Sequence, residues 1–138
     1  MNPLQHWLLF LGTGIFVAGL LVGLVQGRLK NKRMGLSAHL VGVQHGMVLW
    51  ILPFLLPHTT LGDGAQTWLA ALAVYGLYAI WLAMLLAAFW GASRALPMAG
   101  AGFQATPVRE TIVQLLIITG ALASVLAFTL LLWGFWPL

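Results

Sequence analysis

Two histidines in an apolar stretch are the residues whose type and position most directly suggest chemistry. His39 and His45 lie within residues 35–57, a run long and apolar enough to cross a bilayer. Ionisable side chains inside a membrane span are expensive to bury and are candidates for function. A neutral imidazole can ligate a metal, and it can also hold or transfer a proton. The alternative is a structural hydrogen bond to a neighbouring helix, for His45 with Ser124 or Thr119.

A stripe of glycines accompanies the first histidine. At about 100° per residue, Gly35, His39, Gly42 and Gly46 share one helix face within about 60°. A flat ligand could lie against this face, because no side-chain bulk covers it, with the imidazole pointing into the ligand. The pattern therefore predicts Gly42 and Gly46 as cofactor-binding residues. His45 is rotated by about 120° and flanks the stripe, and a spacing of six does not suit two ligands of one small ion.

Two tyrosines lie at about the depth of His45 in a later apolar run. Tyr75 and Tyr78 are neighbours on one helix face, since they are three residues apart. A phenol at this depth can donate a hydrogen bond or protonate a leaving oxygen. We therefore take His45, Tyr75 and Tyr78 as the candidate catalytic residues. The alternative for either tyrosine is helix packing.

One carboxylate and one long loop at the same end of the chain are also candidates. Glu110 opens the last apolar run, where a carboxylate suits the positive end of a helix. A proton port is its alternative role. Residues 93–107, rich in glycine and alanine, predict either a lid or a flexible connector.

The composition limits the kind of protein that positions these residues. Of 138 residues, 62% are hydrophobic and 6% are charged, against roughly 25% charged in a soluble domain. A soluble globular fold and a disordered chain are both excluded. The chain has no cysteine, which excludes disulfides and thiolate ligands, and its two acidic residues make a carboxylate metal cage improbable. A transporter of cationic drugs would need a mid-membrane carboxylate, which the apolar runs lack.

The apolar runs predict an all-α integral membrane protein. Helices are favoured over strands because the runs are continuous rather than alternating. We expect a bundle of four transmembrane helices in a single membrane domain, residues 1–138. The expected spans cover about residues 6–27, 35–57, 67–92 and 110–136.

The basic residues predict an orientation. All six fall in the loops between spans one and two and between spans three and four, so these loops are expected in the cytoplasm and both termini outside. The net charge of +4 thus reports topology, and no nucleic-acid partner is expected. Gly19, Gly23 and Gly27 form two overlapping GxxxG motifs, which favour close helix packing and a homo-oligomer.

Two segments and a loop carry a resemblance to a known family. The sequences GLSAHLVGVQHGM (35–47) and VYGLYAIWLAMLLAAFWGA (74–92), with PMAGAG (97–102), resemble hydroxylaminobenzene mutases over roughly residues 5–136. These are small four-span enzymes of bacterial aromatic compound degradation, which isomerise arylhydroxylamines to ortho-aminophenols. The resemblance implies the same isomerisation of a small aromatic substrate, without net redox change, in the bacterial inner membrane.

A more distant resemblance is to styrene oxide isomerase, a trimeric four-span enzyme with haem b. It implies His39 as the haem iron ligand, and therefore the metal ligand of this chain. His45 takes the place of a substrate-orienting asparagine, and Gly46-Met47 follows it as in that family. Tyr75 is the best match for the tyrosine that orients the substrate, with Tyr78 as the second choice. The resemblance further implies a homotrimer and haem iron used as a Lewis acid on the oxygen of the N–O bond.

Two alternative functions remain open at this point. The first is a small b-type cytochrome subunit that binds haem through the histidines and transfers electrons. The second is an epoxide isomerase of the styrene oxide isomerase type. A histidine at position 45 differs from asparagine because it titrates near neutral pH, so it bears on the choice of substrate.

Overall fold

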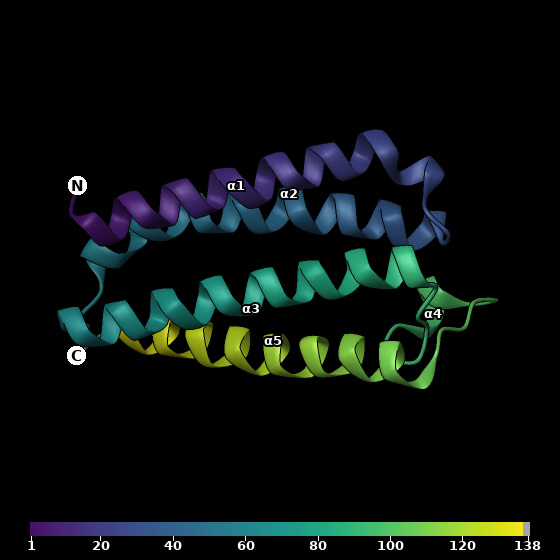
Figure 1. Cartoon of the computed structure of the whole chain (residues 1–138). Helices are drawn as coiled ribbons and strands as arrows, with labels where there is room; N and C mark the ends of the chain where they lie inside the picture. The colour runs from purple at the N-terminus through teal and green to yellow at the C-terminus, as the bar shows by residue number, and fades with distance from the viewer. Residues whose placement is uncertain (137–138) are drawn as a thin grey trace.

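A computed structural model describes residues 1–136 and confirms four long helices, with no strand in that part of the chain (Figure 1). The long helices are α1 (Pro3–Val25), α2 (Lys32–Leu55), α3 (Asp63–Trp90) and α5 (Pro107–Gly134). The shortest has 23 residues, or about 35 Å at 1.5 Å per residue, which exceeds the hydrocarbon thickness of a bilayer. All four are apolar enough to cross a membrane. That the whole chain forms one domain stays a prediction.

The helix ends follow from local sequence. The Asn2 side chain accepts a hydrogen bond from the Gln5 backbone N–H, and the Gln5 side-chain oxygen accepts one from the Asn2 backbone N–H, which together form a capping box for α1. Short 3₁₀ turns, η1 (Gln26–Arg28) and η2 (Leu56–His58), continue α1 and α2. Helix α3 ends at Gly91, whose φ of 74° is left-handed and favours glycine.

The helices pack as two antiparallel pairs. Helix α1 lies against α2, and α3 against α5, while contacts between α2 and α3 join the pairs (Figure 1). A Cβ built on Gly42 would lie 2.7 Å from Gly19 Cα, and one on Gly46 would lie 2.8 Å from the Gly12 carbonyl oxygen. Glycines therefore let the α1 and α2 backbones touch, as small residues do between membrane helices.

The second pair uses small residues in the same way. A Cβ on Gly76 would lie 2.7 Å from the Gly120 carbonyl oxygen of α5. Buried alanines fill much of the rest of this contact; they are Ala79, Ala83, Ala123 and Ala127. This pairing fixes which face of α3 remains for α1, α2 and the membrane.

Glu110 anchors the long loop that precedes α5. Its buried carboxylate accepts hydrogen bonds from the backbone N–H groups of Ser93 (3.1 Å to each oxygen), Arg94 (2.9 Å) and Ala105 (3.0 Å). Both ends of the loop are thus tied to one side chain. This placement supports the helix-start role of Glu110, with the carboxylate serving backbone amides.

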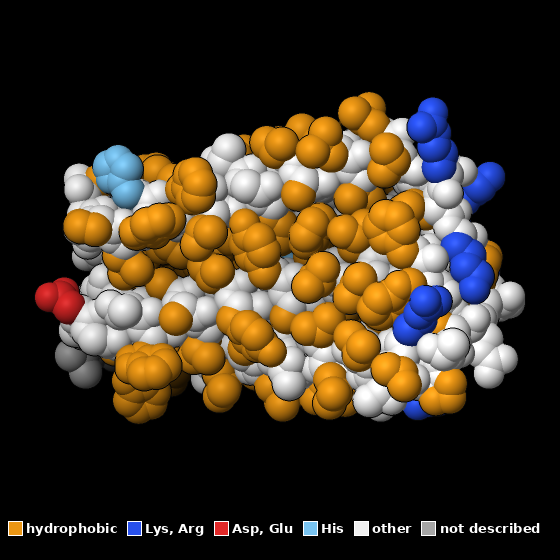
Figure 2. Space-filling view, viewed as in Figure 1, with side chains coloured by type: hydrophobic (Ala, Val, Ile, Leu, Met, Phe, Trp, Pro, Cys, Tyr) orange, Lys and Arg blue, Asp and Glu red, His pale blue; other side chains and the backbone are white. Residues whose placement is uncertain are grey.

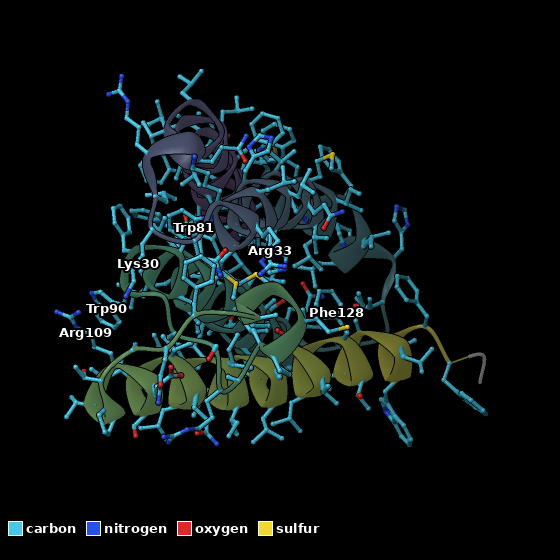
Figure 3. The ribbon with its side chains drawn as sticks, turned by 90° about the vertical axis from the view of Figure 1, so that its right-hand side faces the viewer. Lys30, Arg33, Trp81, Trp90, Arg109 and Phe128 are labelled. Carbon is cyan, nitrogen blue, oxygen red and sulfur yellow. The ribbon has the colours of Figure 1, made fainter. Side chains whose placement is uncertain are left out.

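The same loop is also tied to the start of α2. It contains the short helix α4 (Pro97–Gly100), and the Asn31 side chain donates to the Ala99 carbonyl (2.8 Å). The Arg33 guanidinium donates to the Ala101 carbonyl and reaches toward α4 in Figure 3. Residues 93–107 are therefore held by contacts to the start of α2 and to α5, and a lid role stays a prediction.

Charges mark the two ends of the molecule. The Lys and Arg residues lie at the end formed by η1, the start of α2, the end of α3 and the start of α5 (Figures 1 and 2). The chain begins, and α5 ends, at the opposite end (Figure 1). At the basic end Lys30 donates to the Trp90 carbonyl (3.0 Å) and Arg109 lies 5.4 Å from the centre of the Trp90 ring (Figure 3).

Candidate active site

His39 lies between α2 and α1, partly buried. Its Nδ1 is 2.8 Å from the carbonyl oxygen of Gly19 on α1. A carbonyl oxygen only accepts, so Nδ1 carries the proton and Nε2 keeps the lone pair. Among the buried and partly buried residues of 1–136, only Trp81 and Ser124 have an unpaired polar atom that is fully buried. The unpaired Nε2 of His39 is therefore not fully buried.

His45 makes the same kind of bond on another side of α2. Its Nδ1 donates to the carbonyl of Leu77 on α3 (2.8 Å), so its Nε2 also keeps a lone pair. The hydroxyl partners considered from the sequence are engaged elsewhere or lie apart from it. Thr119 pairs with Tyr75, and Ser124 has no partner.

The directions of the two histidines bear on the electron-transfer alternative. One imidazole is bonded to α1 and the other to α3. An iron ligated by both would need them on one side of α2. The placement within a single chain does not support such a bis-histidine site.

The two tyrosines diverge from their shared helix. Tyr78 donates to the Leu11 carbonyl of α1 (2.7 Å) and is partly buried. Tyr75 is 49% exposed, and its oxygen is 2.8 Å from Thr119 Oγ1 on α5. Because Thr119 donates its one proton to the Leu115 carbonyl (2.8 Å), Tyr75 must be the donor in that pair. Tyr75 is thus the phenol open to the membrane side.

Both tyrosines line an apolar groove of about 250 Å³ along α3, which also includes Trp81, Leu82 and Leu116. An apolar cavity of roughly 150 Å³ is enough for benzene in another protein. The groove is therefore large enough for a one-ring aromatic molecule. Neither histidine is among its lining residues.

The predicted glycine stripe is covered by α1. Gly42 and Gly46 are buried, Gly42 against Gly19 and Trp81, and Gly46 against Phe16 and the Gly12 carbonyl. Both glycines have a packing role here, and contact with a cofactor stays a prediction for them.

The sequence did not indicate Trp81, or the roles that Thr119 and Gly19 have in this region. Trp81 lines the groove while its buried Nε1 lies beside Gly42, and an indole in an apolar run gives no signal that separates it from packing. Thr119 was noticed only as a partner for His45. Gly19 supplies a carbonyl, which no residue type encodes.

A site for a small metal ion would need several ligands close together. In residues 1–136 no three His, Cys, Asp or Glu side chains are grouped as such a site requires. Haem differs in this respect, because its porphyrin supplies four ligands and the protein needs to supply only one axial group.

A comparison with known families identifies the family of this chain. The sequence profile described as styrene oxide isomerase matches residues 4–136, which include all four long helices. The chain belongs to the styrene oxide isomerase family.

Two relatives in Ectopseudomonas oleovorans carry the name hydroxylaminobenzene mutase. HabB is 43% identical to this family member over 133 residues, which cover 96% of this chain and 81% of HabB. HabA is 39% identical over 115 residues, which cover 83% of this chain and 85% of HabA. The resemblance predicted from residues 35–47 and 74–92 is confirmed. This styrene oxide isomerase family member is an isomerase of the mutase kind.

Proposed function

We propose that this isomerase rearranges arylhydroxylamines to aminophenols inside the membrane. The observation that carries the proposal is the His39 geometry: a membrane-embedded imidazole with its Nδ1 proton held by Gly19 and its Nε2 free. The names of HabA and HabB support the substrate class. The groove of about 250 Å³ beside Tyr75 and Tyr78 suits a one-ring aromatic.

The rearrangement conserves atoms and electrons. The N–O bond breaks with its electron pair on oxygen, and this oxygen needs a proton to leave. The oxygen leaves as water, and a water oxygen forms a C–O bond at the ring carbon ortho to nitrogen and gives back the proton. That carbon loses its own proton and the nitrogen gains one, so N–H becomes NH2 and no proton is consumed overall. Apolar walls limit the access of bulk water to the cationic ring while this happens.

The roles of the polar side chains follow from their exposure. Tyr75 would give or hold the proton at the departing oxygen, because its phenol is exposed and bonded only to another hydroxyl. His45 would orient the substrate or hold the proton through Nε2. Tyr78 would support the groove wall, since its proton is committed to the Leu11 carbonyl.

His39 would hold haem iron through its Nε2. Ligating histidines almost always donate their other ring N–H to a carbonyl, carboxylate or water, and His39 does so to Gly19. The chain has no cysteine, and the family resemblance favours His39 over His45, which makes the same kind of bond to α3. When bound, haem iron would supply a Lewis acid for the N–O oxygen. The chain's part is to present Nε2 and to exclude water.

The assembly and orientation belong to the same proposal. A homo-oligomer, a trimer by family resemblance, would let His39 of one copy act with the tyrosine groove of another, since His39 does not line the groove of its own chain. The basic loops would face the cytoplasm of a bacterial inner membrane, with both termini outside. Native mass spectrometry and a reporter fused after Leu138 test these two points.

A substrate comparison and a spectrum test the function. Purified protein in lipid nanodiscs is incubated with hydroxylaminobenzene or with styrene oxide, and products are separated by chromatography. We expect aminophenol from the first substrate and a Soret band from the untreated protein. Conversion of styrene oxide alone would make the chain an epoxide isomerase. A protein without a Soret band would leave His39, His45 and Tyr75 as a site of acid catalysis.

A further inference from the structure

The imidazole of His39 lies against a position of α1 that has no side chain. A Cβ built on Gly23 would lie 2.6 Å from His39 Nδ1 and 2.8 Å from Cε1. Real Cβ atoms do not approach ring atoms so closely. An alanine at position 23 would therefore force the ring, or helix α1, to move.

The three glycines of the GxxxG ladder have different neighbours. Gly19 faces the backbone of Gly42 and Val43, which is ordinary close helix packing. Gly27 has nothing within 4 Å of its Cβ position. Gly23 alone of the three faces a side chain, the ring of His39.

The space at Gly23 decides the protonation pattern of His39. With the ring in this space, Nδ1 reaches the Gly19 carbonyl at 2.8 Å and must carry the proton. The unpaired Nε2 then keeps its lone pair. A ring pushed away from Gly23 would lose the carbonyl and could protonate Nε2 instead.

We propose that Gly23 is a positioning residue, whose bare Cα admits the His39 ring and so fixes the Nδ1–H tautomer with Nε2 free. The effect on catalysis rests on the proposed function of His39. The effect on the tautomer does not, and it can be measured in a protein without any substrate.

The test is ¹⁵N NMR of histidine-labelled protein produced without haem, so that Nε2 carries no iron, with the His39 signals assigned by loss in a His39→Gln variant. We expect wild-type His39 to show a protonated Nδ1 and an unprotonated Nε2. Gly23→Ala should shift this population toward Nε2–H and lower isomerase activity by about 10- to 100-fold, as loss of an outer hydrogen-bond partner does. Gly27→Ala is the matched control and should change neither signal nor activity.

A double variant separates ring accommodation from helix packing. If Gly23→Ala harms the protein through the imidazole, His39→Ala should restore its thermal stability and yield. Equal damage with and without the ring would overturn the proposal, as would wild-type His39 protonated on Nε2 or a tautomer unchanged by Gly23→Ala. Absence of isomerase activity in the wild type would instead refute the proposed function, and the tautomer shift would still identify Gly23 as positioning His39.

Discussion

His39 and His45 stand on one helix, six residues apart, and make the same hydrogen bond in different surroundings. Each donates from Nδ1 to a backbone carbonyl 2.8 Å away, His39 to Gly19 of α1 and His45 to Leu77 of α3. The α1 neighbour presents a glycine to the ring. His45 is bonded to α3, the helix that also carries Tyr75 and Tyr78.

The two histidines share one hydrogen-bond geometry but are bonded to different helices. A carbonyl partner on a neighbouring helix sets the tautomer and leaves Nε2 free in both cases. The contacts of the His39 ring with α1 are the Gly19 carbonyl and the bare Gly23 position. His45 is bonded to α3, the helix that carries both candidate phenols. The proposed roles are therefore ligation for His39 and proton handling for His45, and both stay predictions.

Removing the His39 imidazole should have the largest effect on activity. We expect His39→Ala to lower activity to the uncatalysed rate and to abolish haem binding, since no cysteine exists to substitute and Met47 lies about 80° away around the helix. Product formation and the Soret absorbance measure the two effects. His58→Ala, an exposed histidine in η2, is the control and should resemble the wild type. Haem retained by His39→Ala but lost by His45→Ala would reverse the assignment.

Replacing His45 should have a smaller and graded effect. His45→Ala should keep the haem and lose about 10²- to 10⁴-fold in rate, the range typical of positioned proton donors. His45→Asn, which restores the residue of the styrene oxide isomerase pattern, should retain activity or shift the preferred aryl substrate. Steady-state rates on several arylhydroxylamines measure this. Equal rates for the alanine variant and the wild type would remove His45 from the mechanism.

Gly42 contacts both helices to which the two histidines are bonded, Gly19 on α1 and Trp81 on α3. A Cβ there would lie 2.7 Å from Gly19 Cα and 2.7 Å from Trp81 Nε1. Gly42→Ala should destabilise the fold by about 1–3 kcal/mol, as overpacking does. Gly64→Ala, with open space at its Cβ position, should be neutral in the same thermal unfolding experiment. A variant as stable as the wild type would show that the α1–α2 contact yields easily.

Replacing the two tyrosines should have the smallest effects on rate and stability. Tyr78→Phe should lower stability by about 1 kcal/mol, because the bond to the Leu11 carbonyl is lost, with little change in rate. Tyr75→Phe should lower the rate by at least about 10-fold and change stability less. Thermal unfolding and initial rates of both variants distinguish the roles. The opposite pattern would give the catalytic phenol to Tyr78.

The sequence was sufficient for the helices, while the choice of His39 as the iron ligand stays a prediction. Long apolar runs and unusual ionisable residues can be recognised within a single segment. The structure contains the expected helices and places both histidines within α2. The partners of these residues depend on how helices face each other, which periodicity alone does not determine. Thus the Gly19 and Leu77 carbonyls came only from the structure.

The glycine stripe illustrates the limit of reasoning from one helix. A bare face at Gly42 and Gly46 is equally suited to a flat ligand and to another backbone, and α1 covers it here. Glu110 gives a similar lesson. Its helix-start position was evident, but its amide partners Ser93 and Arg94 come from a loop that folds back onto it.

An anaerobic mass balance tests the central claim most directly, that this chain is a membrane isomerase acting without net redox change. Wild-type protein in nanodiscs receives hydroxylaminobenzene with no electron donor or acceptor, and all aromatic products are quantified beside a His39→Ala sample. The account predicts stoichiometric aminophenol from the wild type and none above background from His39→Ala. Formation of aniline or nitrosobenzene by the wild type, or equal aminophenol from both samples, would contradict it.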